Sequence, residues 1–383
     1  MKGKKVEEIL FIGLVNFNTE KGDAVHFKKL SNFLTQKYNG RFITLTDGKS
    51  DSIHKKIRFP SNKIFRLIYW NIIIFYNAFF FLLTNKKIKV VYFRESGLVI
   101  SPYFLKLFFR TKLIVEINGV NIDDLSIPKS ITKPLFKLLY KISDFITASR
   151  GYVKLLNMEF IVPLSKFIKV QLGYDPYLPK TRSECFKHVE LNSDKKYLLF
   201  IGNLTAYQGL QNVIPALKGL FEKDLDLRLL IVGDGYYLEE VKRLVNEYSL
   251  NERTIFIPRV SKDLIRYYVG ISEIGLSPFS FNRGIKGSIS GLKTFDYLFG
   301  GLPIFTSEMD DMAIMIKDNK WGEYFKESDD IQQIEGMIQN LLINNMSYRK
   351  NVVANRDLLH EKFSWENRFS KIINKIEQML KKK

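Results

Sequence analysis

The chain has 383 residues, enough for two domains of ordinary size and too many for one. Its single cysteine, Cys185, excludes an internal disulfide framework, and its four scattered histidines do not favour a zinc site. The net charge of +19 lies mostly in residues 1–175, which hold 29 Lys or Arg and 13 Asp or Glu, against 30 and 27 in residues 176–383. So basic a half predicts contact with nucleic acid, membrane head groups or a phosphorylated substrate.

Short apolar runs alternate with amphipathic stretches along both halves of the chain. The expected strands are, in order, Ile9–Val15, Phe42–Leu45, Val90–Arg94, Leu113–Glu116, Phe145–Ala148, Phe167–Gln171, Tyr197–Ile201, Leu227–Val232, Thr254–Ile257, Ile274–Ser277 and Pro303–Thr306. The expected helices include Val25–Tyr38, Gln211–Phe221, Leu238–Tyr248 and Lys262–Val269. This alternation predicts two α/β domains with parallel sheets, at residues 1–175 and 194–362, joined by a linker at 176–193. Residues 1–8 lack the apolar region of a signal peptide, so we expect a cytoplasmic protein.

One apolar run, Ile68–Leu83, has more than one interpretation. It has 16 residues and contains Asn71 and Asn77, whereas a membrane span needs about 20 apolar residues. It also falls where a doubly wound domain needs a helix, just before the expected strand Val90–Arg94. We therefore favour a buried domain helix, with a helix partly exposed at a bilayer interface and a membrane span as the alternatives.

The surrounding residues, 51–112, combine cations with aromatic rings. They hold 12 Lys or Arg and two acids, Asp51 and Glu95, with many aromatic residues interleaved. This mixture is typical of a membrane–water boundary, where rings lie at head-group depth and cations meet anionic lipid. The same mixture binds single-stranded nucleic acid, and it also occurs as a solvated basic face over an aromatic core. Periodicity does not separate these three interpretations.

Two glycine-containing turns in the second half each follow an expected strand and precede an expected helix. Gly202 ends the first strand, and Gly209 is expected to open the helix Gln211–Phe221, whose free N–H groups suit an anion such as diphosphate. The second turn is Val232-Gly233-Asp234-Gly235. Because the carboxyl ends of parallel strands meet at one edge of a sheet, both turns are expected to line one crevice.

A third stretch runs from Arg283 through a glycine-rich loop into a helix that starts near Leu292. Lys293 and Asp296 in this helix are three residues apart and therefore share one face. The lysine suits phosphate charge, and the carboxylate accepts hydrogen bonds from sugar or ribose hydroxyls, which together fit a sugar diphosphate. The alternative is an ordinary surface ion pair.

In the first half, acidic residues follow two expected strands, where doubly wound domains place cleft residues. Arg94 and Glu95 follow one strand, and Glu116 and Asn118 lie at the end of another. Glu116 is a candidate to contact a sugar hydroxyl or to act as a base, and Glu95 is nearly as good. The alternative for either is a solvated loop acid. His26, at a helix start, is expected to be structural.

In their order and spacing, the second-half motifs resemble the C-terminal domain of GT-B glycosyltransferases, most closely the retaining GT4 family, or glycosyltransferase group 1. The matching segments are Gly202–Gly209, Val232–Gly235, Leu292–Leu298 and Gly301–Pro303. Shorter matches at Asp144–Ser149, Leu172–Asp175 and Phe363–Trp365 extend the resemblance over nearly the whole chain. It implies a GT-B fold of two Rossmann-like doubly wound domains, with a C-terminal helix at 363–383 that crosses back to the first domain.

The resemblance also implies where substrates bind. Donor residues would be Gly202, Asn203, Gln208 and Gly209 near the diphosphate, Gly233, Asp234 and Gly235 in the nucleotide crevice, Arg259 and Val260 near the base, Lys293 on phosphate with Leu292 beside it, and Asp296 on the ribose. The first domain would bind the acceptor, with Gly22 and Asp23 beside the transferred sugar. The family design needs no metal and no cofactor beyond the nucleotide sugar.

Three departures from the family pattern leave a second hypothesis open. Asn203 and Gln208 stand where most members have arginine and lysine, and Ser288 replaces the first of two family acids, of which Asp296 holds the second place. Either Ser288 or the backbone of the Gly284–Gly291 loop is a candidate to take that acid's place, and Arg283 and Lys286 are candidates to supply the lost positive charge. The alternative function is a non-catalytic GT-B protein that binds a sugar or a partner.

The resemblance thus predicts a retaining, metal-independent transferase that moves a hexose-type sugar from a nucleotide-diphosphate sugar to a hydroxyl acceptor. We expect that acceptor to be lipid-linked, as in bacterial surface polysaccharide or glycoconjugate synthesis, because the basic, aromatic-rich first half suits anionic lipid. A peripheral protein on the inner face of the plasma membrane follows. Nucleic-acid binding becomes the weakest alternative, because no recognition module is visible.

Overall fold

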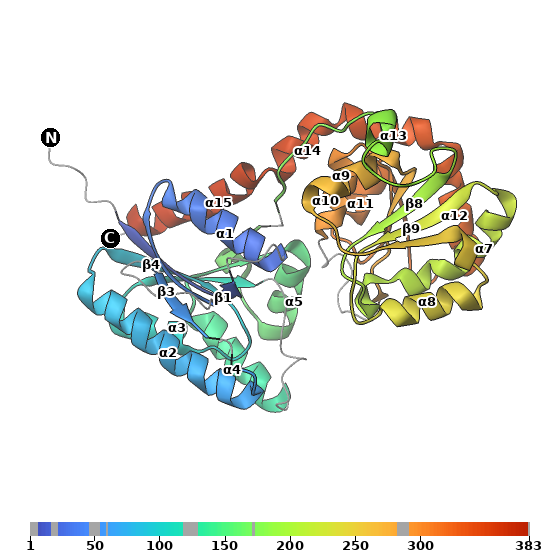
Figure 1. The fold of residues 1–383 in the computed structure, drawn as a ribbon. Helices are drawn as coiled ribbons and strands as arrows, with labels where there is room; N and C mark the ends of the chain where they lie inside the picture. The colour runs from blue at the N-terminus through green and yellow to red at the C-terminus, as the bar shows by residue number, and fades with distance from the viewer. Residues whose placement is uncertain are drawn as a thin grey trace. The chain divides into compact units, whose positions relative to one another are not determined.

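The computed structural model describes residues 7–16, 22–45, 54–58, 60–117, 129–170, 173–281 and 291–381, without the side chains of residues 22, 23, 63, 64, 129 and 150. The chain forms two compact units (Figure 1). The first is Met1–Gly173 together with Trp365–Lys383, and the second is Tyr174–Ser364. The segment 176–193, which we expected to be a linker, lies within the second unit and contains helix α6 (Arg182–Phe186).

The first unit is built on a seven-stranded parallel sheet in the order β3-β2-β1-β4-β5-β6-β7. Its strands are β1 (Glu8–Asn16), β2 (Asn39–Leu45), β3 (His54–Ile57), β4 (Ile88–Arg94), β5 (Lys112–Ile117), β6 (Phe145–Ala148) and β7 (Phe167–Lys169). All six strands expected from the first half are present, and β3 is an additional strand at the sheet edge. The order reverses direction between β1 and β4, as in a doubly wound fold.

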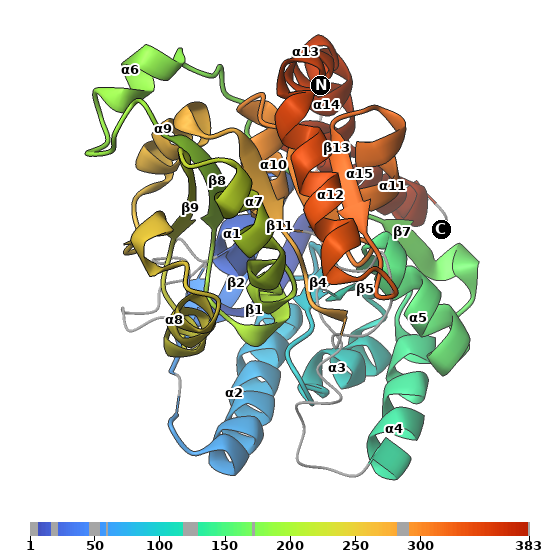
Figure 2. The same ribbon diagram turned by 90° about the vertical axis from the view of Figure 1, so that its right-hand side faces the viewer.

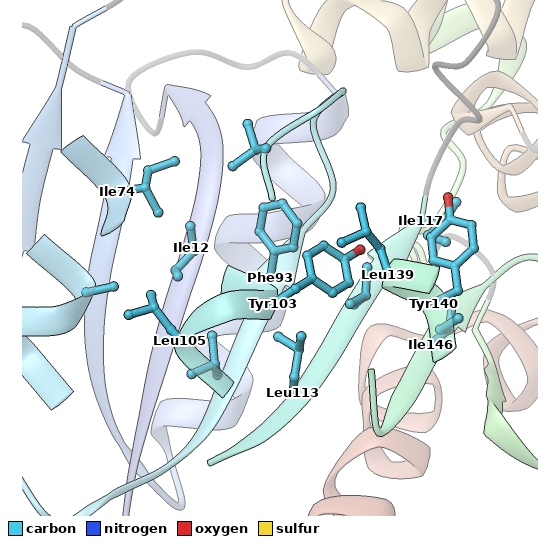
Figure 3. Packing of buried hydrophobic residues seen from close by; sticks show 14 of the residues in the cluster. Ile12, Ile74, Phe93, Tyr103, Leu105, Leu113, Ile117, Leu139, Tyr140 and Ile146 are labelled. Carbon is cyan, nitrogen blue, oxygen red and sulfur yellow. The ribbon is translucent and has the colours of Figure 1, made fainter. Parts of the chain in front are cut away.

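Helices cover both faces of this sheet. They are α1 (Gly22–Thr35), α2 (Lys63–Thr84), α3 (Ser101–Phe109), α4 (Lys129–Ile142), α5 (Arg150–Phe160) and α15 (Trp365–Lys381), with a 3-10 turn at Leu164–Lys166. Helices α2 to α5 pack on one face through the cluster shown in Figure 3, which includes Ile74 of α2 and Tyr103 of α3. Helices α1 and α15 pack on the other face through a separate apolar cluster. Each face of the sheet thus has its own core, which is why its strands are almost continuously apolar.

The second unit has a six-stranded parallel sheet in the order β10-β9-β8-β11-β12-β13. Its strands are β8 (Lys196–Ile201), β9 (Leu227–Val232), β10 (Thr254–Ile257), β11 (Ile274–Ser277), β12 (Ile304–Ser307) and β13 (Gly322–Phe325). Five of the six were expected, and the additional β13 is again an edge strand. The direction of the order reverses between β8 and β11, so the carboxyl ends of these two strands flank the position where such folds bind ligands.

The helices of the second unit lie on both sides of its sheet (Figure 2). They are α7 (Ile214–Lys223), α8 (Leu238–Glu247), α9 (Lys262–Ile271), α10 (Leu292–Phe299), α11 (Ala313–Asp318), α12 (Ile331–Ile343), α13 (Asn345–Ala354) and α14 (Arg356–Phe363). Helix α10 is fixed to the sheet by Tyr297, whose hydroxyl accepts from the Ile201 N–H at 2.9 Å and lies 3.2 Å from the carbonyl oxygens of Leu199 and Leu276. This contact places α10 over β8 and β11, at the reversal of the sheet.

Candidate functional site

Two glycine turns close the carboxyl ends of β8 and β9. Gly202 and Gly233 have φ of 144° and 148°, a region that favours glycine. The turns are bonded to each other, because the Leu204 N–H donates to the Asp234 carbonyl oxygen at 2.8 Å. A Cβ on Gly233 would lie 1.9 Å from the Gly202 carbonyl oxygen, and one on Gly235 would lie 2.1 Å from the Leu204 carbonyl oxygen. The close contact of the two turns therefore requires glycine at positions 233 and 235, and the turns form one surface at this edge of the sheet.

The expectation that Gly209 opens a helix is wrong in detail. Gly209 has φ of 77° and is followed by a 3-10 turn, Leu210–Asn212, so α7 begins only at Ile214. A Cβ on Gly209 would lie 2.2 Å from the Pro278 carbonyl oxygen, beyond the end of β11. Gly209 therefore allows the loops after β8 and β11 to approach each other closely. Because it does not open α7, the argument for diphosphate binding at the start of that helix does not apply.

Lys293 of α10 is buried between aromatic rings at the reversal of the sheet. Its Nζ lies 4.0 Å from the ring centre of Phe200 and 4.9 Å from that of Phe279, and it donates to Oε1 of Gln208. Burial lowers the pKa of Lys293 to about 7, and the negative charge of Asp310 opposes this only in part. The side chain is therefore a cation near its titration point that an incoming anion would stabilise.

Asp296, one helical turn further along α10, is equally buried. Its carboxylate accepts a hydrogen bond from the hydroxyl of Tyr174, and its backbone carbonyl accepts one from Tyr177 at 2.7 Å. Burial raises the pKa of Asp296 to about 6, while the Tyr174 hydrogen bond and the charges of Lys262 and Arg266 lower it. Because Lys293 and Asp296 are buried and have separate partners, the alternative of an ordinary surface ion pair is wrong.

Two features of this region were missed by the sequence analysis. Tyr174 stacks on Phe299 with ring centres 5.1 Å apart, and Nζ of Lys262 lies 4.8 Å from the centre of its ring. Asp310 is buried behind α10, where it accepts from the hydroxyls of Thr294 at 3.0 Å and Thr306 at 3.3 Å. Burial raises the pKa of Asp310 to about 6.

The remaining expected donor residues lie at the same edge of the sheet, nearer to water. Asn203 is exposed, and its Oδ1 accepts from Nη2 of Arg259 at 3.4 Å. Asp234 is also exposed, with Oδ1 2.7 Å from the Gly235 N–H, while Val260 and Leu292 are partly buried. Exposed hydrogen-bonding groups therefore lie at the same edge of the sheet as the buried Lys293, an arrangement suited to a ligand with one anionic end and one polar end.

The first unit brings three of its expected residues together at the carboxyl ends of β4 and β5. Arg94 and Glu116 are register partners, with Nη1 2.5 Å from Oε1, and Nδ1 of His26 lies 3.1 Å from the same oxygen. Glu116 is buried, so the alternative of a solvated loop acid is wrong for this residue. His26 packs against Trp365 and Phe369 of α15, which agrees with a structural role.

The carboxyl group of Glu95 is separate from this cluster, although its backbone N–H donates to the Glu116 carbonyl oxygen at 3.0 Å. Its carboxylate accepts from the hydroxyls of Tyr140 at 3.1 Å and Tyr103 at 3.5 Å. Burial raises the pKa of Glu95 to about 8, against the effect of these two bonds. Glu95 is therefore a mainly protonated acid at neutral pH, unlike a solvated loop carboxylate.

Several expected site residues lie partly or wholly outside the described residues. Gly22 and Asp23 begin α1, and the side chain of Asp23 is among those not described. Asn118, Arg283 and Ser288 lie outside the described residues altogether. Within the described part of the chain, no group of three His, Cys, Asp or Glu side chains is placed to hold a metal ion.

Comparison with known proteins gives three informative similarities. An uncharacterized glycosyltransferase of Methanocaldococcus jannaschii is 21% identical over 67% of this chain and 65% of its own length. The alpha-monoglucosyldiacylglycerol synthase of Streptococcus pneumoniae is 20% identical over 62% of this chain and 48% of its own length. The chain thus spans less than two thirds of these relatives. The crystal structure of Anabaena HepE in complex with UDP and glucose matches 97% of this chain and 100% of that one, with a TM-score of 0.75 and 10% identity.

Two parallel sheets, each with a reversal in its strand order, and this structural match define the class: the protein has the GT-B fold of glycosyltransferases. The family model described as glycosyl transferases group 1 matches residues 181–357. This matched region contains both glycine turns and α10.

Proposed function

We propose that the protein transfers a hexose-type sugar from a nucleotide-diphosphate sugar to a hydroxyl acceptor, with the donor bound at the Lys293 edge of the second unit. The observation that carries this proposal is the buried Lys293, a cation with its pKa near 7 at the point where the sheet reverses. HepE, which has a similar fold, is complexed with UDP and glucose, which supports a uridine diphosphate sugar as the first donor to test.

The roles of the site residues follow from their chemistry. Lys293 balances the negative charge that grows on the diphosphate as the bond to the sugar breaks. Asp296, ionised above about pH 6, accepts hydrogen bonds from the ribose hydroxyls. The two glycine turns let the backbone approach the nucleotide closely. We propose that the anomeric configuration is retained and that the leaving phosphate takes the acceptor's proton, with no metal required.

We further propose that the acceptor is a lipid-linked glycan or a lipid and that the protein acts as a peripheral protein on the inner face of a bacterial plasma membrane. The excess of basic residues in positions 1–175 supports this acceptor class, because it favours an anionic surface. The relative that synthesises a monoglucosyldiacylglycerol supports a lipid acceptor as well. A role in surface polysaccharide or glycoconjugate synthesis follows.

Donor binding is tested by thermal denaturation of the full chain with UDP, GDP, ADP and dTDP and their sugars. A ligand at about 100 times its Kd stabilises by about 2.7 kcal/mol, so one base is expected to raise the melting temperature by several degrees. The Asp296→Asn variant is expected to lose most of this rise. Glu327→Gln, at an exposed position, serves as the matched control.

The result that contradicts donor binding is the absence of stabilisation by every one of these nucleotides and nucleotide sugars. Stabilisation of the wild type with no consumption of the donor, in the presence of lipid acceptors, would instead support the non-catalytic alternative. The departures at Asn203, Gln208 and Ser288 motivate this arm of the experiment.

A further inference from the structure

Helix α2 has apolar side chains on both of its faces. Its inner face, with Ile74, Ala78, Phe81 and Leu82, is buried in the core of the first unit. Its outer face carries the exposed side chains of Phe65, Ile68, Ile72, Tyr76, Phe80 and Leu83, which we name the outer stripe. Their spacing of three or four residues places them along one side of the helix over its whole length of about 33 Å. A helix surface that faces water is normally polar, so this stripe indicates a non-aqueous environment.

The stripe continues onto the neighbouring helix. Helix α3 packs beside α2, with the rings of Phe79 and Phe109 at 5.0 Å, and exposes Phe104, Leu107 and Phe108. Helices α2, α3 and α4 lie on the same side of the first sheet (Figures 1 and 2). Together α2 and α3 carry ten of the exposed large apolar side chains of the described residues, more than the whole second unit.

The two polar residues inside the α2 run do not interrupt the outer stripe. The amide of Asn71 donates to the Leu98 carbonyl at 3.0 Å, and its oxygen accepts from the Ile100 N–H at 2.8 Å, so it faces the start of α3. Asn77 donates to the Ile73 carbonyl of its own helix at 2.8 Å. Both amides are therefore bonded within the protein, and the outward surface is apolar.

The charges around the stripe decide between a bilayer and a protein partner. Exposed cations follow the ends of both helices, Lys86 and Lys87 after α2 and Arg110 after α3, and α4 adds Lys137 and Lys141. In residues 54–112 the one acid is Glu95, which is bonded to two tyrosines. The acids nearest to α3 and α4 are paired with other lysines, Asp144 with Lys106 at 2.8 Å and Glu159 with Lys133 at 2.6 Å. Apolar side chains bordered by such an excess of cations complement an anionic lipid surface, where the side chains enter the acyl boundary and the cations contact phosphate.

The length and composition of Phe65–Thr84 would also permit a membrane span. The inner face of α2 excludes this, because its side chains complete the core over the sheet. A spanning orientation would carry that core and the strand backbone into the bilayer. A helix held flat against a folded unit, with one apolar side free, instead lies in the plane of the interface.

We infer that the outer stripe of α2, extended by α3, is an insertion surface on which the protein docks in the plane of an anionic bilayer. Docking itself is inferred from the stripe and the surrounding cations. Its purpose, access to a lipid-linked acceptor, rests on the proposed function. Docking brings the first unit to the layer that holds such acceptors, so that the acceptor does not have to leave the bilayer completely.

The test is cosedimentation of the full chain with vesicles of phosphatidylglycerol and phosphatidylcholine, and with vesicles of phosphatidylcholine alone. The triple variant Ile72→Ser, Tyr76→Ser, Phe80→Ser is expected to lower binding to the anionic vesicles about 100-fold, since it removes three inserted apolar side chains. The matched control changes three comparably exposed residues of the second unit, Ile314→Ser, Ile343→Ser and Met346→Ser, and is expected to bind as the wild type does. The double variant Lys137→Glu, Lys141→Glu is expected to weaken binding to the anionic vesicles and to leave binding to the phosphatidylcholine vesicles unchanged.

Orientation is measured with an environment-sensitive dye on single introduced cysteines, since Cys185 is buried. Labels on Ile68→Cys, Tyr76→Cys and Leu83→Cys are expected to report one shallow depth, and a gradient of depth across the bilayer would overturn the in-plane orientation.

The inference is contradicted if the wild-type protein does not bind anionic vesicles at low salt. A second contradicting result is a wild-type protein that forms a dimer in solution and does not bind vesicles, if the triple variant is a monomer. In that case a second copy of the chain covers the outer stripe. Binding is measured without donor, so its failure leaves the test of donor binding unaffected.

Discussion

Lys293 is held in a position that costs stability. A buried ammonium group is penalised by desolvation, and the surrounding rings of Phe200 and Phe279 replace only part of its hydration. Since its pKa falls from 10.5 to about 7, the unfolded chain binds more protons than the folded one between these values, and stability rises with pH across that range. Such a group is expected where charge is to be received from a ligand.

This leads to a prediction about proton uptake. A bound diphosphate raises the pKa of Lys293, so binding of UDP at pH 7 is expected to take up about half a proton, and more at pH 8. Calorimetry in buffers of different ionisation enthalpy measures this uptake. The Lys293→Met variant is expected to lose it, whereas Lys326→Met, at an exposed position, keeps it. Equal uptake by Lys293→Met and the wild type would remove Lys293 from the phosphate site.

The sequence was informative about residues close together in the chain. Lys293 and Asp296 could be identified because they share a helical turn near glycines. Tyr174 lies 122 positions from Asp296, and no local pattern connects a hydrogen bond across that separation. Asp310 depends in the same way on Thr294, which the packing of α10 against β12 brings to it. The partners of the site residues therefore could not be predicted, although the residues themselves could.

At the level of elements, the strands that were missed share one property. β3 and β13 are edge strands, so part of each is exposed, and the sequence of β3, His-Lys-Lys-Ile, has no continuous apolar run. The buried central strands carry such runs and were all expected. The prediction of α2 was correct for its inner face, but periodicity gave no sign that the apolar outer face is uncovered.

Asn71 provides a prediction at this scale. Its side chain joins α2 to the start of α3 by accepting from the N–H groups of Ile100 and Ser101. Asn71→Ala leaves these donors and the Leu98 carbonyl without this partner and is expected to lower the free energy of unfolding by about 1–3 kcal/mol. Urea unfolding followed by tryptophan fluorescence measures the change.

The control is Asn77→Ala, which removes one bond within a single helical turn and is expected to cost about 0.5 kcal/mol or less. If the two variants are equally stable, Asn71 does not fix α3 beside α2. The joint apolar surface of the two helices would then lack this structural support.

For the whole molecule, the basic charge and the proposed donor site belong to different parts of the chain. The excess of cations lies in residues 1–175, whereas both glycine turns, Lys293 and Asp296 lie in the second unit. Under the proposed function, this charge suits the acceptor and its surroundings better than the nucleotide. The separation of the basic charge from the donor motifs was predictable from counts along the sequence. The exposed outer stripe of α2 was not, because exposure depends on how the helices pack.

The most direct test of the central claim is transfer of labelled sugar from a nucleotide sugar to bacterial membrane lipid. The full chain is incubated with labelled UDP-glucose, and then with other nucleotide sugars, in the presence of a lipid extract and EDTA. We predict that label enters the lipid phase with the wild-type protein and falls at least about 100-fold with Lys293→Met or Asp296→Asn. If the wild-type protein consumes none of the nucleotide sugars, with or without added divalent metal, the proposed function is contradicted.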